Sequence, residues 1–259
     1  MIRTLVTLGE KTYHTDLSAP IDLSIPIHPD GPRAWYVEPM KISPVRTARF
    51  TGSVAEGGAV NFRDIWFNPH GHGTHTECAG HIQEEVQSIN QTLTRFFAAA
   101  ALVSIDPSVY EGPELAHMRS GDLVINEENM RKAFASAGRV DAVVVRTQPN
   151  TAAKRHTDYS HTNPAYFAPE ALAYLRKCGV KHLLTDLPSV DREEDGGGLL
   201  AHRAFWQSGH PGDAECTITE FVFVPDSVAD GLYLLNLQVA PFENDASPSR
   251  PVLYALRPA

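Results

Sequence analysis

Residues 68–81 read N-P-H-G-H-G-T-H-T-E-C-A-G-H, and the interpretation of the whole chain starts from this stretch. It gathers four of the twelve histidines and one carboxylate: His70, His72, His75, His81 and Glu77. Imidazole nitrogens and carboxylate oxygens are ligands that zinc, manganese and iron prefer. His75 and Glu77 are two residues apart, so they share one face of an extended chain. The glycines at 71 and 73 permit a tight turn, which makes either His70 or His72 a first ligand of a predicted metal site.

The alternative interpretation of residues 68–81 is a polar, histidine-rich surface loop that binds nothing. It leaves unexplained why the stretch contains neither lysine nor arginine. Short motifs also arise by chance, so the metal site is a hypothesis that the fold has to support.

The run G-T-H-T-E-C-A-G-H, residues 73–81, resembles the signature of the metal-dependent cyclase and kynurenine formamidase family, written His-x-Gly-Thr-His-x-Asp-x-Pro-x-His. The resemblance implies that His75 and Glu77 are metal ligands. It also implies that His81 stays free of the metal and works as the catalytic acid and base.

The sequence departs from that signature at three positions. Glutamate stands for the aspartate at Glu77, alanine for the proline at Ala79, and glycine for the first histidine at Gly71. One extra residue in the turn makes His70 the first ligand, and one residue fewer makes it His72. We favour His70.

A second region of resemblance lies further along the chain. Asp186–Asp191, D-L-P-S-V-D, resembles the Asp-Thr-Pro-Ser-x-Asp segment of the same family. In that family a histidine and a following glutamate complete the metal site. His202 and Glu220 match these two ligands by position, and His210 is the alternative to His202. Glu220 has apolar neighbours in T-I-T-E-F-V-F-V, where a carboxylate is costly to bury unless it is paired or binds metal. The alternative is a surface position for Glu220 on an edge strand.

Length and composition exclude several classes of protein. The chain has 259 residues, 42% hydrophobic and 20% charged, as expected of a soluble globular protein, and we expect one domain over residues 1–259. A formal net charge of -9 without a basic stripe argues against a nucleic-acid partner. The longest apolar stretch is far shorter than the ~20 residues of a membrane helix, and the first residues, M-I-R-T-L-V-T-L-G, lack an apolar core long enough for a secretory signal. Three cysteines without a C-x-x-C pair favour a reducing compartment, so we predict a cytoplasmic protein without a membrane partner.

Strand and helix patterns alternate from residue 121 onward, which indicates a sheet with helices packed against it. We expect three helices: residues 127–137, residues 169–178 and a short one within 88–97. Asn126 is expected to cap the first of them. Strands are expected at residues 21–27, 64–68, 99–105, 123–125, 141–147, 181–186, 217–224, 232–239 and 252–256. The glycine triplet at 196–198 predicts a mobile loop without a helix opening there. With the resemblance, the expected fold class is α/β: a mixed β-sheet or barrel-like core with flanking helices (swivelling β/β/α, cyclase-like).

The resemblance implies a metal-dependent hydrolase of a small amide, N-formyl or cyclic substrate. A hydroxide on the metal attacks the carbonyl, and His81 is the general acid and base. One or two divalent ions, Zn or Mn, are expected, with Glu77 able to bridge two. Rival motifs are absent, since the chain has neither G-x-S-x-G nor H-E-x-x-H. The alternative is a non-catalytic metal-binding or assembly protein on the same fold, which has no use for an unligated His81.

Candidate substrate contacts are three residues near these motifs. Trp35, in the loop 28–39, and Trp66, just before the metal motif, suit a flat substrate, although loop aromatics equally often cover a core. Arg63 suits a substrate carboxylate or is a plain surface charge. The sequence does not identify the substrate itself. By resemblance we expect a homo-oligomer, a dimer or a tetramer.

Overall fold

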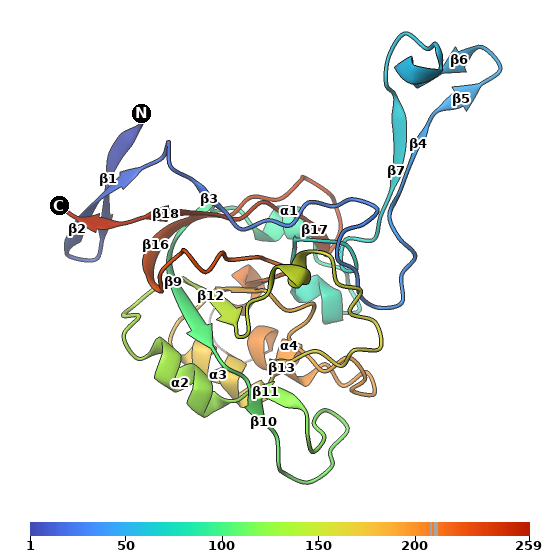
Figure 1. The fold of residues 1–259 in the computed structure, drawn as a ribbon. Coiled ribbons are helices and arrows are strands. Elements are labelled where there is room, and N and C mark those ends of the chain that lie inside the picture. Colours follow the sequence, from blue (N-terminus) through green and yellow to red (C-terminus); the bar gives the residue numbers. More distant parts are fainter. Residues whose placement is uncertain (208, 210–211) are drawn as a thin grey trace.

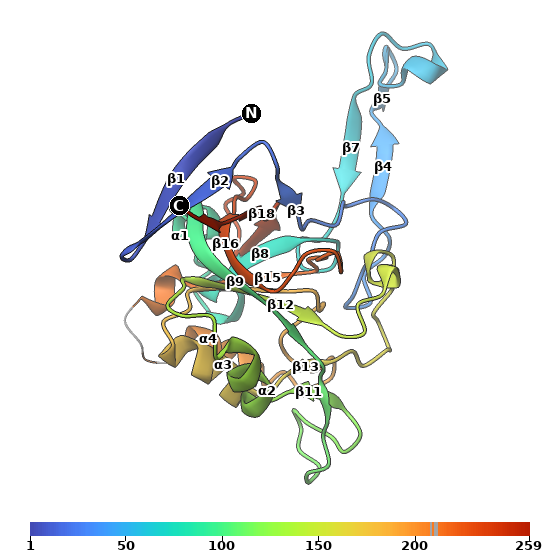
Figure 2. The same ribbon diagram turned by 60° about the vertical axis from the view of Figure 1, so that its left-hand side comes forward.

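A curled nine-stranded sheet forms the centre of the fold (Figures 1 and 2). The structure is a computed structural model that describes residues 1–207, 209 and 212–259. In spatial order the strands are β17 (Ala246–Pro248), β8 (His75–Cys78), β15 (Thr217–Glu220), β14 (His182–Thr185), β12 (Ala142–Thr147), β9 (Phe97–Ile105), β16 (Gly231–Asn236), β18 (Val252–Ala255) and β3 (Ile21–Asp22). The four strands from β15 to β9 are parallel, and the pairs on either side of them are antiparallel. The expected α/β class with a mixed sheet is therefore confirmed.

The middle of the sheet is buried on both faces, which explains its runs of valine and alanine. All six residues of β12, A-V-V-V-R-T, are buried. Val143 and Val145 belong to the larger hydrophobic cluster, whereas Ala142 and Val144 belong to a second cluster. Because side chains alternate along a strand, these two sets lie on opposite faces of the sheet.

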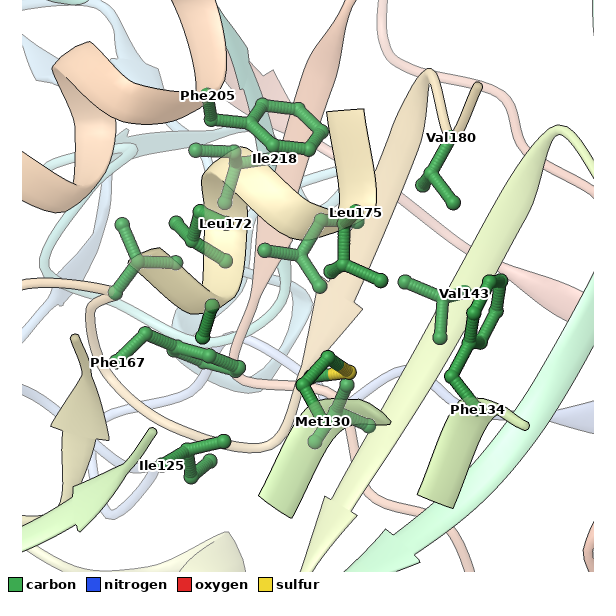
Figure 3. Close-up of a cluster of buried hydrophobic side chains, with 14 of the residues drawn as sticks. Ile125, Met130, Phe134, Val143, Phe167, Leu172, Leu175, Val180, Phe205 and Ile218 are labelled. Carbon is green, nitrogen blue, oxygen red and sulfur yellow. The ribbon is translucent and has the colours of Figure 1, made fainter. Parts of the chain in front are cut away.

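Three helices cover one face of the sheet. They are α2 (Glu127–Phe134), α3 (Pro169–Lys177) and α4 (Leu200–Trp206), and a single turn, α1 (Ile89–Thr92), lies elsewhere. Figure 3 shows Met130 of α2, Leu172 of α3 and Phe205 of α4 meeting Val143 and Ile218 of the sheet. None of the described helices has the length and apolar character needed to cross a membrane.

The sequence pattern places most of these elements correctly. The Asn126 side chain caps α2 as expected and accepts a hydrogen bond from the Asn129 backbone. The strand expected at 21–27 is shorter, because only Ile21–Asp22 pairs with β18. The expectation of no helix after the glycine triplet was wrong: α4 begins at Leu200, directly behind it.

Smaller elements surround the central sheet. A three-stranded sheet joins both termini: β1 (Arg3–Leu8), β2 (Lys11–Asp16) and β19 (Arg257–Pro258). Another joins β10 (Ser108–Val109), β11 (Leu123–Ile125) and β13 (Tyr166–Phe167). The short 3₁₀ helices are η1 (Val54–Glu56), η2 (Ala79–Ile82), η3 (Ala152–Arg155) and η4 (Asp213–Glu215).

A long hairpin projects from the body of the protein, as Figures 1 and 2 both show. We call residues 41–66 the arm. It contains β4 (Lys41–Pro44) paired with β7 (Arg63–Trp66), and beyond them β5 (Arg46–Thr47) paired with β6 (Phe50–Thr51). Every residue of β7 is exposed. Among the described residues, no second layer of structure therefore covers this strand of the arm.

Candidate metal centre

Strand β8 carries His75 and Glu77 into the interior of the sheet. It lies between β15 and β17, and its register places His75 opposite Glu220. All four residues of the strand are buried. Gly73 precedes the strand with a φ of 63°, and a Cβ there would lie 3.0 Å from a backbone carbonyl oxygen, so the turn requires glycine. Strand pairing thus brings together ligand candidates that are far apart in the sequence.

His75 gives the clearest sign that a ligand is needed. Its side chain is fully buried, and its Nδ1 lies 3.2 Å from the Gly73 carbonyl oxygen, to which Nδ1–H donates. Its Nε2 has no hydrogen-bond partner among the described residues, and Glu220 Oε2 lies 3.4 Å away. A buried polar group without a partner costs about 1–3 kcal/mol. A cation held between this nitrogen and the Glu220 carboxylate removes the cost, so the donor set fits a divalent metal ion.

His202, on α4, is held in a similar way by Asp191. Its Nδ1 lies 2.5 Å from Asp191 Oδ2, and the same carboxylate accepts hydrogen bonds from the backbone N–H groups of Ala201 and His202. Its Nε2 lies 3.1 Å from Glu77 Oε1. A carboxylate that holds one imidazole nitrogen fixes the ring and leaves the other nitrogen for a metal. Asp191 therefore presents His202 to Glu77.

His70 reaches the cluster from the loop that precedes β8. Its Nδ1 lies 2.9 Å from Glu77 Oε2, and its Nε2 lies 2.8 Å from Asp245 Oδ2. The two oxygens of Glu77 therefore face different histidines, Oε2 towards His70 and Oε1 towards His202. The Glu77 carboxylate is thus oriented so that it can take part in two groups of ligands, one with His70 and one with His202.

His81, on η2, lies beside the same carboxylates. Its Nδ1 is 3.2 Å from Asp245 Oδ2 and 3.9 Å from Glu77 Oε2, and 29% of its side chain is exposed. Three overlapping groups have ligand atoms within 4.8 Å of one another: His70, His75 and Glu77; Glu77, His81 and His202; His70, His81 and Asp245. His81 is thus the most accessible histidine of the cluster.

The charges of the cluster favour a cation. Burial acts to raise the pKa of the Glu77 carboxyl, but the surrounding histidines outweigh burial and hold this pKa well below its usual value. Burial acts to lower the pKa of His202, but hydrogen bonds to Asp191 and Glu77 raise it well above the usual value. Buried carboxylates need a positive partner, which protonated histidines or a divalent cation can supply.

A cavity of about 390 Å³ opens onto the cluster. This volume lies within the range of small-molecule sites. Residues of the cluster line one part of it, and Trp35, Val37, Arg192 and Leu199 line another. The geometry therefore combines a cation site with space for a small molecule beside His81.

The loop that carries Trp35 has an unusual backbone. Trp35 and Tyr36 both have positive φ, 62° and 58°, which is rare for residues other than glycine. The Tyr36 N–H donates to Ser160 Oγ at 3.0 Å, and the Tyr36 hydroxyl donates to Glu193 Oε1 at 3.0 Å. Such backbone strain persists where surrounding contacts impose it, and it is frequent at ligand sites. These contacts hold the Trp35 ring at the cavity wall.

Comparison with known protein families gives a match over most of the chain. The family described as "Putative cyclase" matches residues 16–192, which is more than half of the chain. The chain belongs to this family. The cyclase family is the one that the runs at 73–81 and 186–191 resemble, and both runs lie inside the matched range.

Two curated relatives are consistent with membership of the cyclase family. Kynurenine formamidases of Bacillus cytotoxicus and Bacillus anthracis are each 29% identical to this cyclase-family chain, over 203 and 202 residues, which are 78% of this chain and 83% of each relative. The predicted family and the prediction of a hydrolase are thereby confirmed.

Solved structures show the same fold. A potential metal-dependent hydrolase with cyclase activity has a TM-score of 0.63 at 18% identity, over 91% of this chain and 97% of that one. Isatin hydrolase A of Labrenzia aggregata has a TM-score of 0.62 at 15% identity, over 92% of this chain and 93% of that one. At such identities the likeness concerns the fold alone.

The geometry bears on the choice between His70 and His72. The Asn68 N–H donates to His72 Nδ1 at 2.9 Å, and His72 Nε2 lies 2.9 Å from the Glu38 carbonyl oxygen. Both nitrogens of His72 are therefore occupied by the backbone. His70 lies in the cluster instead, which supports it as the first ligand in this member of the cyclase family.

Two predicted substrate contacts lie away from the cavity. Arg63 and Trp66 are on β7 of the arm, both exposed, and neither lines the cavity. The Trp66 ring lies 5.5 Å from Lys41 Nζ. Of the three predicted contacts, Trp35 lines the cavity. The competing histidine His210 lies outside the described residues.

Three residues at the site were not predicted: Asp191, Arg192 and Asp245. Asp191 lies in the D-L-P-S-V-D run, so the resemblance marked its position but not its contact with His202. Asp245 lies in the segment P-F-E-N-D-A-S-P-S-R-P, residues 241–251, which resembles the closing segment of the family but indicates no role for this carboxylate. Only the pairing of β17 with β8 brings it to the histidines.

Proposed function

We propose that the protein is a metal-dependent hydrolase that cleaves a carbon–nitrogen bond in a small amide, N-formyl or cyclic substrate. The observation that carries this proposal is the buried Nε2 of His75, which has no hydrogen-bond partner among the described residues and lies beside the Glu220 carboxylate; Glu220 and His81 line the same cavity. The kynurenine formamidase relatives support an N-formyl substrate, and the isatin hydrolase fold supports a cyclic one.

The residues that would hold the metal are His70, His75, Glu77, His202 and Glu220. One or two divalent ions, zinc or manganese, bound there would supply a nucleophile at neutral pH by lowering the pKa of water to about 7. The carboxylates of Asp191 and Asp245 each hold one ring nitrogen of His202 and His70, respectively. The other ring nitrogen of each histidine is therefore oriented before the metal binds.

The remaining steps fall to His81 and Trp35. His81 lines the cavity, and imidazole is the side chain best suited to both taking and giving a proton near neutral pH. It accepts a proton as water attacks the carbonyl carbon, and it returns the proton to the departing nitrogen. The Trp35 ring offers a flat apolar surface on which a substrate ring can pack.

The experiment that tests this function combines metal content with turnover. Protein purified without chelator should contain about one or two equivalents of zinc or manganese per chain. It should turn over at least one compound in a panel of N-formyl aromatic amines, cyclic imides and lactones. Chelation should abolish turnover, and added metal should restore it.

A matched variant and two outcomes make this test decisive. His75→Ala should lower both metal content and turnover. Full metal without turnover of any panel compound would favour the non-catalytic metal-binding protein. Turnover that survives complete removal of the metal would contradict the proposal.

We also propose a homo-oligomer in which the arm packs against a second copy of the chain. The arm has large apolar side chains that the described residues leave exposed: Ile42, Phe50, Val54, Val60, Phe62, Ile65 and Trp66. A two-stranded ribbon is only marginally stable alone, and apolar patches of this kind mark interaction surfaces. The arms of identical chains offer each other the same apolar surface, so self-association covers both.

Light scattering during size-exclusion chromatography tests the oligomer. The wild type should have a multiple of the 28.4 kDa chain mass. Phe62→Asp combined with Ile65→Asp should give a monomer, because each change replaces an exposed apolar side chain of the arm with a charge. Val109→Asp, an equally exposed change outside the arm, should leave the oligomer intact. A monomeric wild type would reject this proposal.

Two other assignments stay proposals. One domain over residues 1–259 is supported by the central sheet, whose strands come from β3 at one end of the chain and β18 at the other. A cytoplasmic location is supported by three free cysteines, Cys78, Cys178 and Cys216. Limited proteolysis that leaves one core fragment checks the first, and cell fractionation checks the second.

A further inference from the structure

Asp245 is fixed by the backbone to the strand that carries the ligands. It directly precedes β17, whose Ala246 pairs with Glu77 of β8. The Asp245 carbonyl oxygen accepts a hydrogen bond from the Cys78 N–H at 3.1 Å, and the preceding Asn244 carbonyl accepts one from Ile89 at 2.8 Å. The position of the Asp245 side chain therefore follows from the sheet and not from a free loop.

One oxygen of Asp245 serves two histidines. Oδ2 lies 2.8 Å from His70 Nε2 and 3.2 Å from His81 Nδ1. The two imidazole rings lie side by side, with their centroids 4.3 Å apart and their planes 32° apart. Only 15% of the Asp245 side chain is exposed. A partly buried carboxylate thus connects a ligand candidate with the proposed proton shuttle.

This shared oxygen decides where the imidazole protons sit. An ionised carboxylate only accepts hydrogen bonds, whereas a neutral imidazole has one donor and one acceptor nitrogen. When a metal ion is bound, His70 donates from Nε2 to Asp245, which leaves the lone pair of Nδ1, on the side of Glu77 Oε2, for the metal. His81 must donate from Nδ1, which leaves the lone pair on Nε2, a nitrogen without a hydrogen-bond partner in the part of the chain that the structure describes. The two histidines are held in opposite tautomers.

We propose that Asp245 is a positioning residue with two simultaneous tasks. It prepares His70 to bind metal through Nδ1, and it prepares His81 to accept a proton through Nε2. The second task rests on the proposed function, because it needs a reaction in which His81 moves a proton. The first task needs only that the metal binds.

The rival assignment makes Asp245 itself a metal ligand, since His70, His81 and Asp245 also have ligand atoms within 4.8 Å of one another. That arrangement would use the Nδ1 of His81 for metal. The Nδ1 signal of His81 would then change when metal binds, which the positioning role does not predict.

The kinetic test uses Asp245→Asn with Glu243→Gln as the matched control. Glu243 lies in the same loop, but its carboxylate accepts hydrogen bonds from Asn90 and Gln91 and touches no histidine of the cluster. At saturating metal, Asp245→Asn should lower kcat by about 10- to 100-fold, the range typical of a lost partner behind a ligand, with KM nearly unchanged. Glu243→Gln should behave as the wild type.

The same substitution made in a His81→Ala background separates positioning from general damage. If Asp245 acts through His81, Asp245→Asn should lower kcat by less than about threefold in the His81→Ala background. The proton shuttle that Asp245 positions is already missing from that variant. An equal fall in both backgrounds would mean that Asp245 does not act through His81, and it would overturn the second task.

A spectroscopic test does not depend on turnover. Long-range ¹⁵N spectra of the histidine side chains distinguish the two tautomers, and the signal missing from His81→Ala identifies His81. In the wild type His81 should be protonated on Nδ1, and in Asp245→Asn a large share should move to Nε2. An unchanged tautomer would overturn the proposal, as would a His81 Nδ1 signal that shifts like a ligand when zinc is added. If the wild type hydrolyses nothing, the proposed function fails while these spectra still decide the role of Asp245.

Discussion

His81→Ala should leave the metal bound and lower kcat by about 10²–10⁴-fold, the usual contribution of a positioned acid–base group. The side chain lines the cavity, and its Nδ1 contacts Asp245 and not a ligand histidine. Removing it therefore takes away proton transfer and spares the donors of His70, His75 and His202. The loss should appear in kcat, because proton transfer favours the transition state over the bound substrate.

Metal content and rate must be measured on one preparation of this variant. His14→Ala is the control, since His14 is an exposed histidine on β2, outside the cluster. Metal lost together with His81 would make it a ligand. Full metal with full activity would remove His81 from the mechanism.

His70→Ala should lower the affinity for zinc or manganese at least about tenfold, because even partners of ligands contribute 10- to 100-fold. His72→Ala should change that affinity little, although the two residues are neighbours in the motif. His72 instead bonds the backbone at Asn68 and Glu38, so its removal should lower the thermal midpoint. Titration calorimetry and thermal unfolding of both variants measure the two effects. The reverse pattern of affinities would make His72 the ligand.

The part of the site that lies within one strand could be predicted from the sequence. His75 and Glu77 are two residues apart, and the alternation of side chains along a strand is a local property. The resemblance then assigned His81, His202 and Glu220 by position. Asp245 was out of reach of this reasoning, because its role depends on the register of β17 against β8 and not on its neighbours in the chain.

The same division holds for the fold. The apolar runs of β9 and β12 and the capped start of α2 are local signals, so they were predicted nearly to their ends. Helix α4 has no side-chain cap, and it starts from Leu199 with a φ of 48°, so the sequence lacks the usual sign of a helix start. Strand β4 is exposed on the arm, and without a buried face it shows little of the apolar alternation that identifies strands, whereas its partner β7 overlaps the strand expected at residues 64–68.

The neighbours of β8 in the sheet have a consequence for how the protein is made. The strand is synthesised early, but its partners β15 and β17 both come from the last part of the chain. Contacts between such distant segments form late, because the long intervening loop must close first. On the ribosome, His75 and Glu77 therefore wait for Glu220 and Asp245 to emerge from the exit tunnel. Assembly of the proposed metal centre is then a late step of folding, and a chain that stops before β17 would have most of the proposed ligands without Asp245 beside them.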